Sequence, residues 1–302
     1  MAIADLKAKQ QISKRTRQAT TAYAKNILMN KLKKKLIKSW LKKRNALSHK
    51  GDHGHALLIA GQKGYMGAAI IAAKAAMRTG VGLLTVSVPS DERLALQVAL
   101  PEAMLVPRAP DELNMDKCSA VGIGPGLGTN RESEKLLADA LARLKQPLLL
   151  DADALNILSG NKKLLAEIPA GTIITPHVKE FDRLFGIHQN NDERVATAIR
   201  KAKELHLIIV LKGHETAIIS AEQILYNTTG NAGLAKGGSG DALTGVITSL
   251  LAQGYAPLTA ACIGVYLHGL AADLCLKQQS MESMLITDII DHFGKAFKKI
   301  WG

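Results

Sequence analysis

A glycine-rich segment at residues 227–245, NTTGNAGLAKGGSGDALTG, carries the clearest chemical signal in the sequence. Gly237, Gly238 and Gly240 can bring backbone N–H groups close together, and the apolar run after Asp241 predicts a helix. Clustered N–H groups and a helix N-terminus bind anions such as phosphate. A carboxylate beside a phosphate is unfavourable because the two negative charges repel each other. Its presence is explained if it takes a proton from an attacking hydroxyl, so Asp241 is typical of a general base in phosphoryl chemistry. The alternative is that Asp241 only caps the helix.

Two common nucleotide-binding signatures do not occur in the sequence. No segment reads GxxxxGK[ST], which argues against a standard P-loop. The glycines of GIGPGLG at residues 122–128 are spaced by two throughout and do not satisfy GxGxxG. The glycine-rich segment therefore belongs to another class of phosphate site.

The residues around this segment predict a series of alternating strands and helices. Short, almost wholly apolar runs predict buried parallel strands at residues 55–61, 82–89, 119–126, 147–153, 171–177 and 207–213. Helical patterns lie between most of them, residues 216–227 predict a hairpin, and three helical stretches follow the glycine-rich segment. We expect one α/β domain with a central, mainly parallel sheet and helices on both faces. Its ligands should gather at the carboxyl ends of the strands, where Gly, Asp, His, Lys and Thr recur.

The net charge of +13 is concentrated at one end of the chain. Residues 1–50 hold 15 Lys and Arg and one acid, whereas the remainder holds 24 Lys and Arg and 25 acids. Leu28, Leu32, Leu36 and Trp40 recur at helical spacing, which predicts a basic helical arm over residues 1–47 ahead of a domain at 48–302. The arm could pack on the body or a neighbouring subunit, bind an acidic surface such as membrane or RNA, or act in targeting. Packing is the favoured interpretation.

Other features of the composition indicate a cytoplasmic protein. The three cysteines, Cys118, Cys262 and Cys275, form no CxxC pair, which favours buried free thiols. No apolar run approaches the length that crosses a bilayer, and no secretory signal opens the chain, so we expect no membrane insertion. Aromatic residues make up only 4%, and the near-neutral body further disfavours nucleic-acid binding.

Taken together, the motifs resemble those of the ADP/ATP-dependent NAD(P)H-hydrate dehydratases of the ribokinase-like superfamily. The segments SHKGDHGHALLIAG, GYMGAA, RTGVGLLTV, IGPGLG, LLDADALN, ITPHVKEF, VLKGHET and NTTGNAGLAKGGSGDALTG follow that family's order over residues 48–270. Thr228 and Ala232 stand where the family usually has prolines, and Ala242 replaces a usual Val or Thr. No epimerase domain, which many bacterial members carry, precedes these motifs, so we expect a separate NAD(P)HX epimerase.

The resemblance implies a ribokinase-like fold and repair of NAD(P)H that has gained water at C6 of its nicotinamide ring (NAD(P)HX). A phosphoryl group from ADP or ATP would activate the C6 hydroxyl, and its departure as phosphate would restore NAD(P)H. Bacterial members use ADP and release AMP, which suggests ADP here. The preference between hydrated NADH and hydrated NADPH stays open. The family also implies Mg²⁺ and a homotetramer.

The resemblance also assigns roles to individual residues, with Asp241 as the base that deprotonates the C6 hydroxyl. The hydrated cofactor would contact Ala68, Gly126, His177 and Asp241. The adenine nucleotide would contact Lys212, Gly213, His214, Glu215, Thr216, Gly237, Gly238, Ser239 and Gly240. Glu180 matches a superfamily acid that helps to hold Mg²⁺ indirectly. Asp151, Asp153 and Asn156 are further candidates that could equally cap the next helix.

Two other functions are compatible with parts of the sequence. A vitamin-precursor or sugar kinase, such as a hydroxyethylthiazole kinase, would share the glycine-rich loop and its acid. A nucleic-acid-associated module would work through the basic arm. Among the histidines, His49, His53 and His55 lack the spacing of a zinc site, and His268 lies in an apolar helical pattern typical of a protein core.

Overall fold

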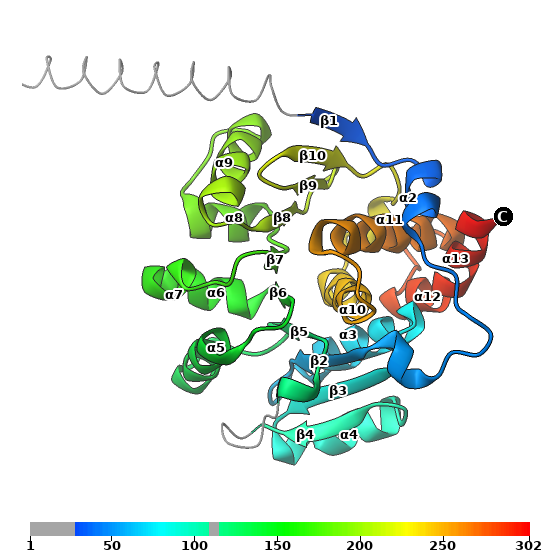
Figure 1. Cartoon of the computed structure of the whole chain (residues 1–302), viewed down its shortest axis with the longest axis horizontal. Helices are drawn as coiled ribbons and strands as arrows, with labels where there is room; N and C mark the ends of the chain where they lie inside the picture. The colour runs from blue at the N-terminus through cyan, green and yellow to red at the C-terminus, as the bar shows by residue number, and fades with distance from the viewer. Residues whose placement is uncertain (1–27, 109–114) are drawn as a thin grey trace, which may run out of the picture.

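A computed structural model describes residues 28–108 and 115–302 of the chain (Figure 1). In these residues ten strands form one sheet in the order β1-β10-β9-β8-β7-β6-β5-β2-β3-β4. The strands are β1 Leu28–Lys31, β2 His55–Ile59, β3 Leu83–Val88, β4 Met104–Pro107, β5 Ala120–Ile123, β6 Leu148–Leu150, β7 Ile173–Ile174, β8 Ile208–Leu211, β9 Ala217–Ile219 and β10 Gln223–Tyr226. Only β9 runs antiparallel to its neighbours, so the predicted, mainly parallel sheet is confirmed.

Helices cover both faces of the sheet, as Figure 1 shows. One face carries α2 Lys34–Trp40, α3 Met66–Thr79, α4 Arg93–Ala99, α10 Ser239–Ala252, α11 Pro257–Cys275, α12 Ile286–Asp291 and α13 Phe293–Trp301. The other carries α5 Arg131–Arg143, α6 Asp153–Gly160, α7 Lys162–Ala166, α8 Val178–Phe185 and α9 Asn191–Glu204. Within β2, Ala56 and Leu58 pack into the first core and Leu57 and Ile59 into the second. Burial on both faces explains why this strand reads as a continuous apolar run.

The N-terminal segment differs from the predicted continuous helix. Residues 28–31 form a strand that pairs parallel with β10, and the helix begins only at Lys34. Leu32, which lies between the two elements, and Ile37 are both fully buried against the domain. The apolar residues of this segment therefore reflect burial against the body and not one continuous helical face. Residues 28–41 thus pack on the body as favoured, while residues 1–27 lie outside the described residues. The division at residue 47 stays a prediction.

Several basic side chains of this segment bond the ends of helices in the body. Lys38 Nζ donates to the carbonyl of Trp301, Lys42 Nζ donates to that of Gly254, and Arg44 donates to that of Gly80. These carbonyls lie at or just beyond the C-termini of α13, α10 and α3. Cations stabilise helix C-termini because the last carbonyl groups lack partners within the helix and carry partial negative charge.

Two further predictions about the helices need correction. The last predicted helical stretch is broken at His292 into α12 and α13. The expectation that no apolar run approaches membrane-spanning length is wrong for α11, whose 19 residues satisfy that test by length and composition. Residues such as Ile263 and Leu267 are fully buried, and α11 packs against α10 and α13, so it is a core helix of this domain.

The three cysteines are buried, as predicted.

Candidate active site

The glycine-rich segment leads into the N-terminus of α10 and places Asp241 in its first turn. Gly238 occupies the position before the helix with φ of +92°, and a Cβ atom there would lie 2.7 Å from Cδ1 of Ile71. Only glycine suits both the left-handed backbone and this close contact. Asp241 is the third helical residue, and no side-chain cap is found at this end of the helix among the described residues. Asp241 is therefore not the N-cap. The N–H of Ser239, the first helical residue, donates to the carbonyl of Lys236 at 3.3 Å, and the next N–H groups of the first turn have no carbonyl partner within the helix.

Lys212 extends from the end of β8 to the first turn of α10. Its Nζ lies 2.9 Å from Oδ1 of Asp151 and 3.9 Å from Oε2 of Glu180. A Cβ atom at Gly240 would lie only 3.2 Å from the same Nζ, so the ammonium group lies against the start of the helix. Burial alone would lower the pKa of Lys212, but the charges of Asp151 and Glu180 raise it above its usual range. Lys212 is thus held as a cation at the N-terminal end of α10.

Asp151 organises this part of the site although the sequence ranked it as a secondary candidate. Its carboxylate is almost fully buried at the end of β6. Oδ1 accepts from Lys212, and Oδ2 accepts from the Thr244 hydroxyl at 2.8 Å. Thr244 lies three residues after Asp241, so it is on the same face of α10. Thr244 was not among the predicted site residues, and this three-residue spacing from Asp241 is the sequence signal that points to it.

The pKa of Asp241 is raised to about 6 from an ordinary value of 3.8. Burial is the largest cause because it disfavours the charged carboxylate. Repulsion by Asp151 raises the pKa further, whereas Lys212 opposes the increase. A carboxylate with this pKa is ionised at neutral pH yet accepts a proton more readily than an exposed aspartate, as a general base requires.

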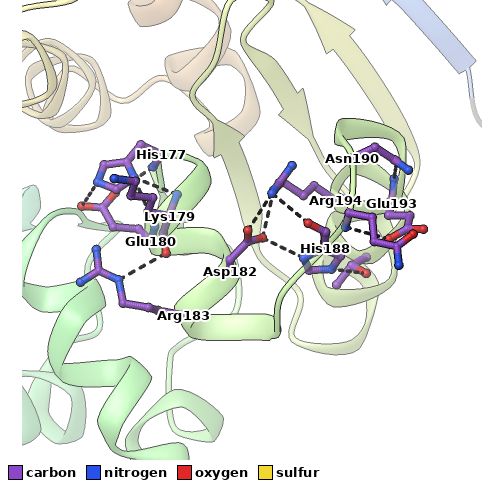
Figure 2. A network of polar contacts seen from close by, with 11 residues as sticks. His177, Lys179, Glu180, Asp182, Arg183, His188, Asn190, Glu193 and Arg194 are labelled. Carbon is purple, nitrogen blue, oxygen red and sulfur yellow. Dashed lines mark hydrogen bonds and ion pairs between the residues drawn. The ribbon is translucent and has the colours of Figure 1, made fainter.

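His177 and Glu180 form a reciprocal cap at the start of α8, shown in Figure 2. His177 Nδ1 accepts from the backbone N–H groups of Lys179 and Glu180, and Glu180 Oε2 accepts from the backbone N–H of His177 at 2.8 Å. Burial lowers the pKa of His177 despite the nearby Glu180 charge. The neutral ring therefore carries its proton on Nε2, and the side chain remains half exposed. A backbone bridge pairs His177 with Lys212.

The rest of the network in Figure 2 anchors α8 to α9. Arg194 donates to both carboxylate oxygens of Asp182, at 3.0 and 2.7 Å, and the His188 ring lies 2.8 Å from the same carboxylate. These side chains are largely buried, and the two-point contact fixes the orientation of both partners. The helix that carries His177 and Glu180 is therefore held rigidly.

Ala68 and Gly126, predicted to contact the hydrated cofactor, lie side by side. A Cβ atom at Gly126, where φ is +58°, would lie 3.0 Å from Cβ of Ala68. Two residues later, the N–H of Gly128 donates to Oδ2 of Asp153 at 2.8 Å, and Asn156 bonds the other oxygen of that carboxylate. Asp153 and Asn156 therefore fasten the loop after β5 to the start of α6.

The predicted nucleotide residues 213–216 form the turn between β8 and β9. Gly213, His214 and Glu215 are exposed, and the Thr216 hydroxyl donates to the Gly213 carbonyl at 3.3 Å. Their position directly after Lys212 puts them at the carboxyl end of β8. Contact of these residues, and of Gly237 and Ser239, with a nucleotide stays a prediction.

Lys236, which was not among the predicted site residues, anchors the glycine-rich segment. Its Nζ donates to the carbonyls of Glu282 and Met284, at 2.5 and 2.6 Å. Elsewhere in the segment, the Thr228 hydroxyl donates to the carbonyl of Leu32 at 2.6 Å. Thr228 therefore has a use that a proline would lack, because it ties the segment to the residue that follows β1. Nothing in the structure explains Ala232.

The three histidines near the start of the domain have polar partners, whereas the buried Nε2 atom of His268 has no hydrogen-bond partner among the described residues, so the expectation of a satisfied core histidine there is wrong. His53 bonds the Ser48 hydroxyl, His55 bonds the Thr85 hydroxyl, and His49 lies 3.5 Å from the Asp52 carboxylate. His268 is buried in α11, as predicted, and burial lowers its pKa to about 4.

Comparison with known proteins identifies the family of this chain. The family model described as NAD(P)H-hydrate dehydratase matches residues 56–295. The chain is 35% identical to the bifunctional NAD(P)H-hydrate repair enzyme Nnr of Moorella thermoacetica, over 84% of this chain and 51% of that protein. It is 40% identical to the ADP-dependent (S)-NAD(P)H-hydrate dehydratase of Neisseria meningitidis, over 79% of this chain and 83% of that protein. The chain spans about half the length of the bifunctional relatives that it matches.

A solved structure extends the likeness to three dimensions. The ADP/ATP-dependent NAD(P)H-hydrate dehydratase of Bacillus subtilis, co-crystallised with ATP and Mg²⁺, superposes with a TM-score of 0.80 at 32% identity. The match covers 91% of this chain and 99% of that one, which confirms the ribokinase-like α/β fold. The chain belongs to the NAD(P)H-hydrate dehydratase family.

Proposed function

We propose that the protein dehydrates NAD(P)HX at the expense of ADP and so restores NAD(P)H, with release of AMP and phosphate. The observation that carries this proposal is the position of Asp241. Its carboxylate has a pKa raised to about 6 and lies in the first turn of α10, beside a lysine held in its charged form. A base and an anion-binding helix end are thus combined in one place.

The chemistry follows from these positions. Asp241 takes the proton of the C6 hydroxyl, whose oxygen attacks the terminal phosphorus of the nucleotide, and the bond to the bridging oxygen breaks to release AMP. The N–H groups of Gly237, Gly238 and Gly240 and the Lys212 ammonium stabilise the charge on the transferring phosphoryl group. The ring nitrogen then expels phosphate from C6, and loss of a proton from the adjacent carbon restores the reduced ring.

Mg²⁺ fits this proposal as a companion of the nucleotide. The described residues contain no cluster of three or more His, Cys, Asp or Glu side chains that could hold a metal ion. The nucleotide phosphates would therefore supply most of the ligands, and the ion would offset their negative charge. Glu180, whose oxygens are engaged by the His177 backbone and lie near Lys212, would act through these neighbours.

The preference for ADP rests on relatives named ADP-dependent, among them the Neisseria meningitidis and Listeria monocytogenes proteins. A homotetramer, a cytoplasmic location and a separate NAD(P)HX epimerase that supplies the usable epimer complete the proposal. The contacts assigned to Ala68, Gly126 and His177 on the cofactor side, and to residues 212–216 and 237–240 on the nucleotide side, are part of it.

The test is a direct assay with hydrated NADH, Mg²⁺ and either ADP or ATP. Return of the reduced-nicotinamide absorbance, with one phosphate and one AMP released per turnover when ADP is used, is the expected result. No recovery with either nucleotide, together with phosphorylation of hydroxyethylthiazole or a similar alcohol, would instead identify a small-molecule kinase. Asp241→Asn should keep nucleotide binding and lose turnover by a factor of about 10² or more.

A further inference from the structure

A cavity lies at the opposite ends of the two helices, α3 and α10, that carry Ala68 and Asp241. It has a volume of about 620 Å³ and is lined by the C-terminal ends of α3 and α10, by α13 and by residues 41–44. Helix α10 has 14 residues and is therefore about 20 Å long, so the cavity is remote from Asp241. Cavities of this size suit small organic ligands.

The rim of the cavity is strongly basic. Lys42, Lys43, Arg44 and Arg78 line it, and none of its described lining residues is an acid. Arg78 is paired with Asp291 at 3.3 Å, and Lys42 and Arg44 each bond one backbone carbonyl. An ammonium group has three N–H donors and a guanidinium group has five, so both retain donors for an anion.

The floor of the same cavity is apolar. Val81 and Leu250 are buried there, and Met77, Phe297 and Trp301 are partly exposed. Lys43 Nζ lies 5.6 Å from the ring centroid of Trp301 and Lys42 Nζ lies 4.9 Å from that of Tyr255, which places cationic groups at the edge of the apolar surface. An inorganic anion would pair with the basic rim but leave the apolar floor exposed to water. An uncharged apolar molecule would cover the floor but make no ion pair with the rim.

We infer that this cavity is a binding site for an amphipathic organic anion, with a phosphate or carboxylate at the rim and an apolar body on the Phe297–Trp301 floor. Charge complementarity and the apolar surface support the same occupant. The site is separate from the proposed catalysis, because none of the residues assigned to substrate or nucleotide lines it. Part of its basic rim, Lys42 to Arg44, lies outside residues 56–295, where the family model matches.

The two tryptophans of the sequence make a specific reporter possible. Trp301 lines the cavity and Trp40 does not, so Trp40→Phe leaves Trp301 as the single tryptophan. Octyl phosphate, kept below its micellar concentration, is the probe, and inorganic phosphate and octanol test its two halves separately. We expect a saturable change in Trp301 emission with octyl phosphate, and binding at least about tenfold weaker with either half alone.

Lys43→Glu in this background tests the rim, since the described contact of Lys43 is with the Trp301 ring. It should weaken octyl phosphate binding about tenfold or more, because an attractive charge becomes repulsive. Lys145→Glu, at an exposed lysine beyond α5, is the matched control and should leave binding unchanged. Calorimetry provides a second readout that does not depend on the emission of Trp301. If circular dichroism shows that Lys43→Glu is misfolded, Lys43→Gln, which removes the charge without reversing it, is used in its place.

Three results would overturn the inference. The first is the lack of saturable octyl phosphate binding by both fluorescence and calorimetry. The second is equal affinity in the Lys43 and Lys145 variants. The third is inorganic phosphate binding as tightly as octyl phosphate, which would leave a plain anion site. Because the readout is binding, none of these results depends on the dehydratase activity.

Discussion

Replacing Asp241 by asparagine should stabilise the protein at neutral pH while it removes catalysis. The pKa of this carboxyl is raised from 3.8 to about 6 in the folded state, mainly by burial. An acid whose pKa is raised by folding binds its proton more tightly in the native state, so it costs stability progressively as the pH rises from the unfolded-state pKa to the folded-state pKa, and the full cost applies above the latter. A difference of about two pKa units corresponds to about 3 kcal/mol at most. Because Asp241 is partly exposed and its charge favours the N-terminus of α10 by about 0.3–1 kcal/mol, we expect a net gain of about 1–2 kcal/mol.

The sign of this effect has a clear pH window. Below about pH 4 the Asp241 carboxyl is protonated in both states, so asparagine should give no advantage there. The advantage should grow between about pH 4 and pH 6 and stay constant above it. Urea unfolding of both proteins at several pH values measures the difference in the free energy of unfolding. An asparagine variant that is less stable at neutral pH, or equally different at all pH values, would refute the electrostatic cost assigned to Asp241.

The other predictions concern single residues. In the wild-type enzyme kcat/KM should fall as the pH decreases through about 6, because Asp241 must be ionised. Asp151→Asn should move this decrease to lower pH because it removes a negative charge that raises the pKa of Asp241. A pH-rate profile that is the same in both proteins would contradict this link. Ile37→Ala should cost about 2–5 kcal/mol in urea unfolding because the side chain is fully buried, and a cost near zero would show that the N-terminal segment does not belong to the core. Gly238→Ala should lower activity and thermal stability together because of its positive φ and the contact with Ile71, and a variant with normal activity would contradict this backbone requirement.

Much of the fold could be predicted from the sequence because burial on both faces leaves a strong signal. The strands at the centre of the sheet, such as β2 and β5, are continuous apolar runs bounded by glycines and were found at nearly the right positions. The edge strand β4 was missed because its side chains are only partly buried, which weakens its apolar pattern. Strand β1 was missed because the tertiary pairing with β10 overrides a leucine spacing that predicts helix.

The candidate site shows a similar division. Asp241, Lys212 and His177 could be found because they lie in motifs at the carboxyl ends of strands and at helix starts. The central position of Asp151 could not be found from the sequence, because an acid between a strand and a helix has the sequence pattern of a helix cap. Only the fold shows that Lys212 and Thr244, which lie 61 and 93 residues away along the chain, converge on its two oxygens.

The pairing of β1 with β10 has a consequence for synthesis on the ribosome. Residues 28–31 emerge about 195 residues before their partners at 223–226, and translation at roughly 5–20 residues per second makes this delay about 10–40 s. During that interval the nascent strand has no native neighbour and could pair with another chain. The strand ends in Lys31 and is followed by Lys33, Lys34 and Lys35, and repulsion between like charges on neighbouring nascent chains opposes such pairing. The lysines near β1 thus protect an early strand that must wait for a late partner.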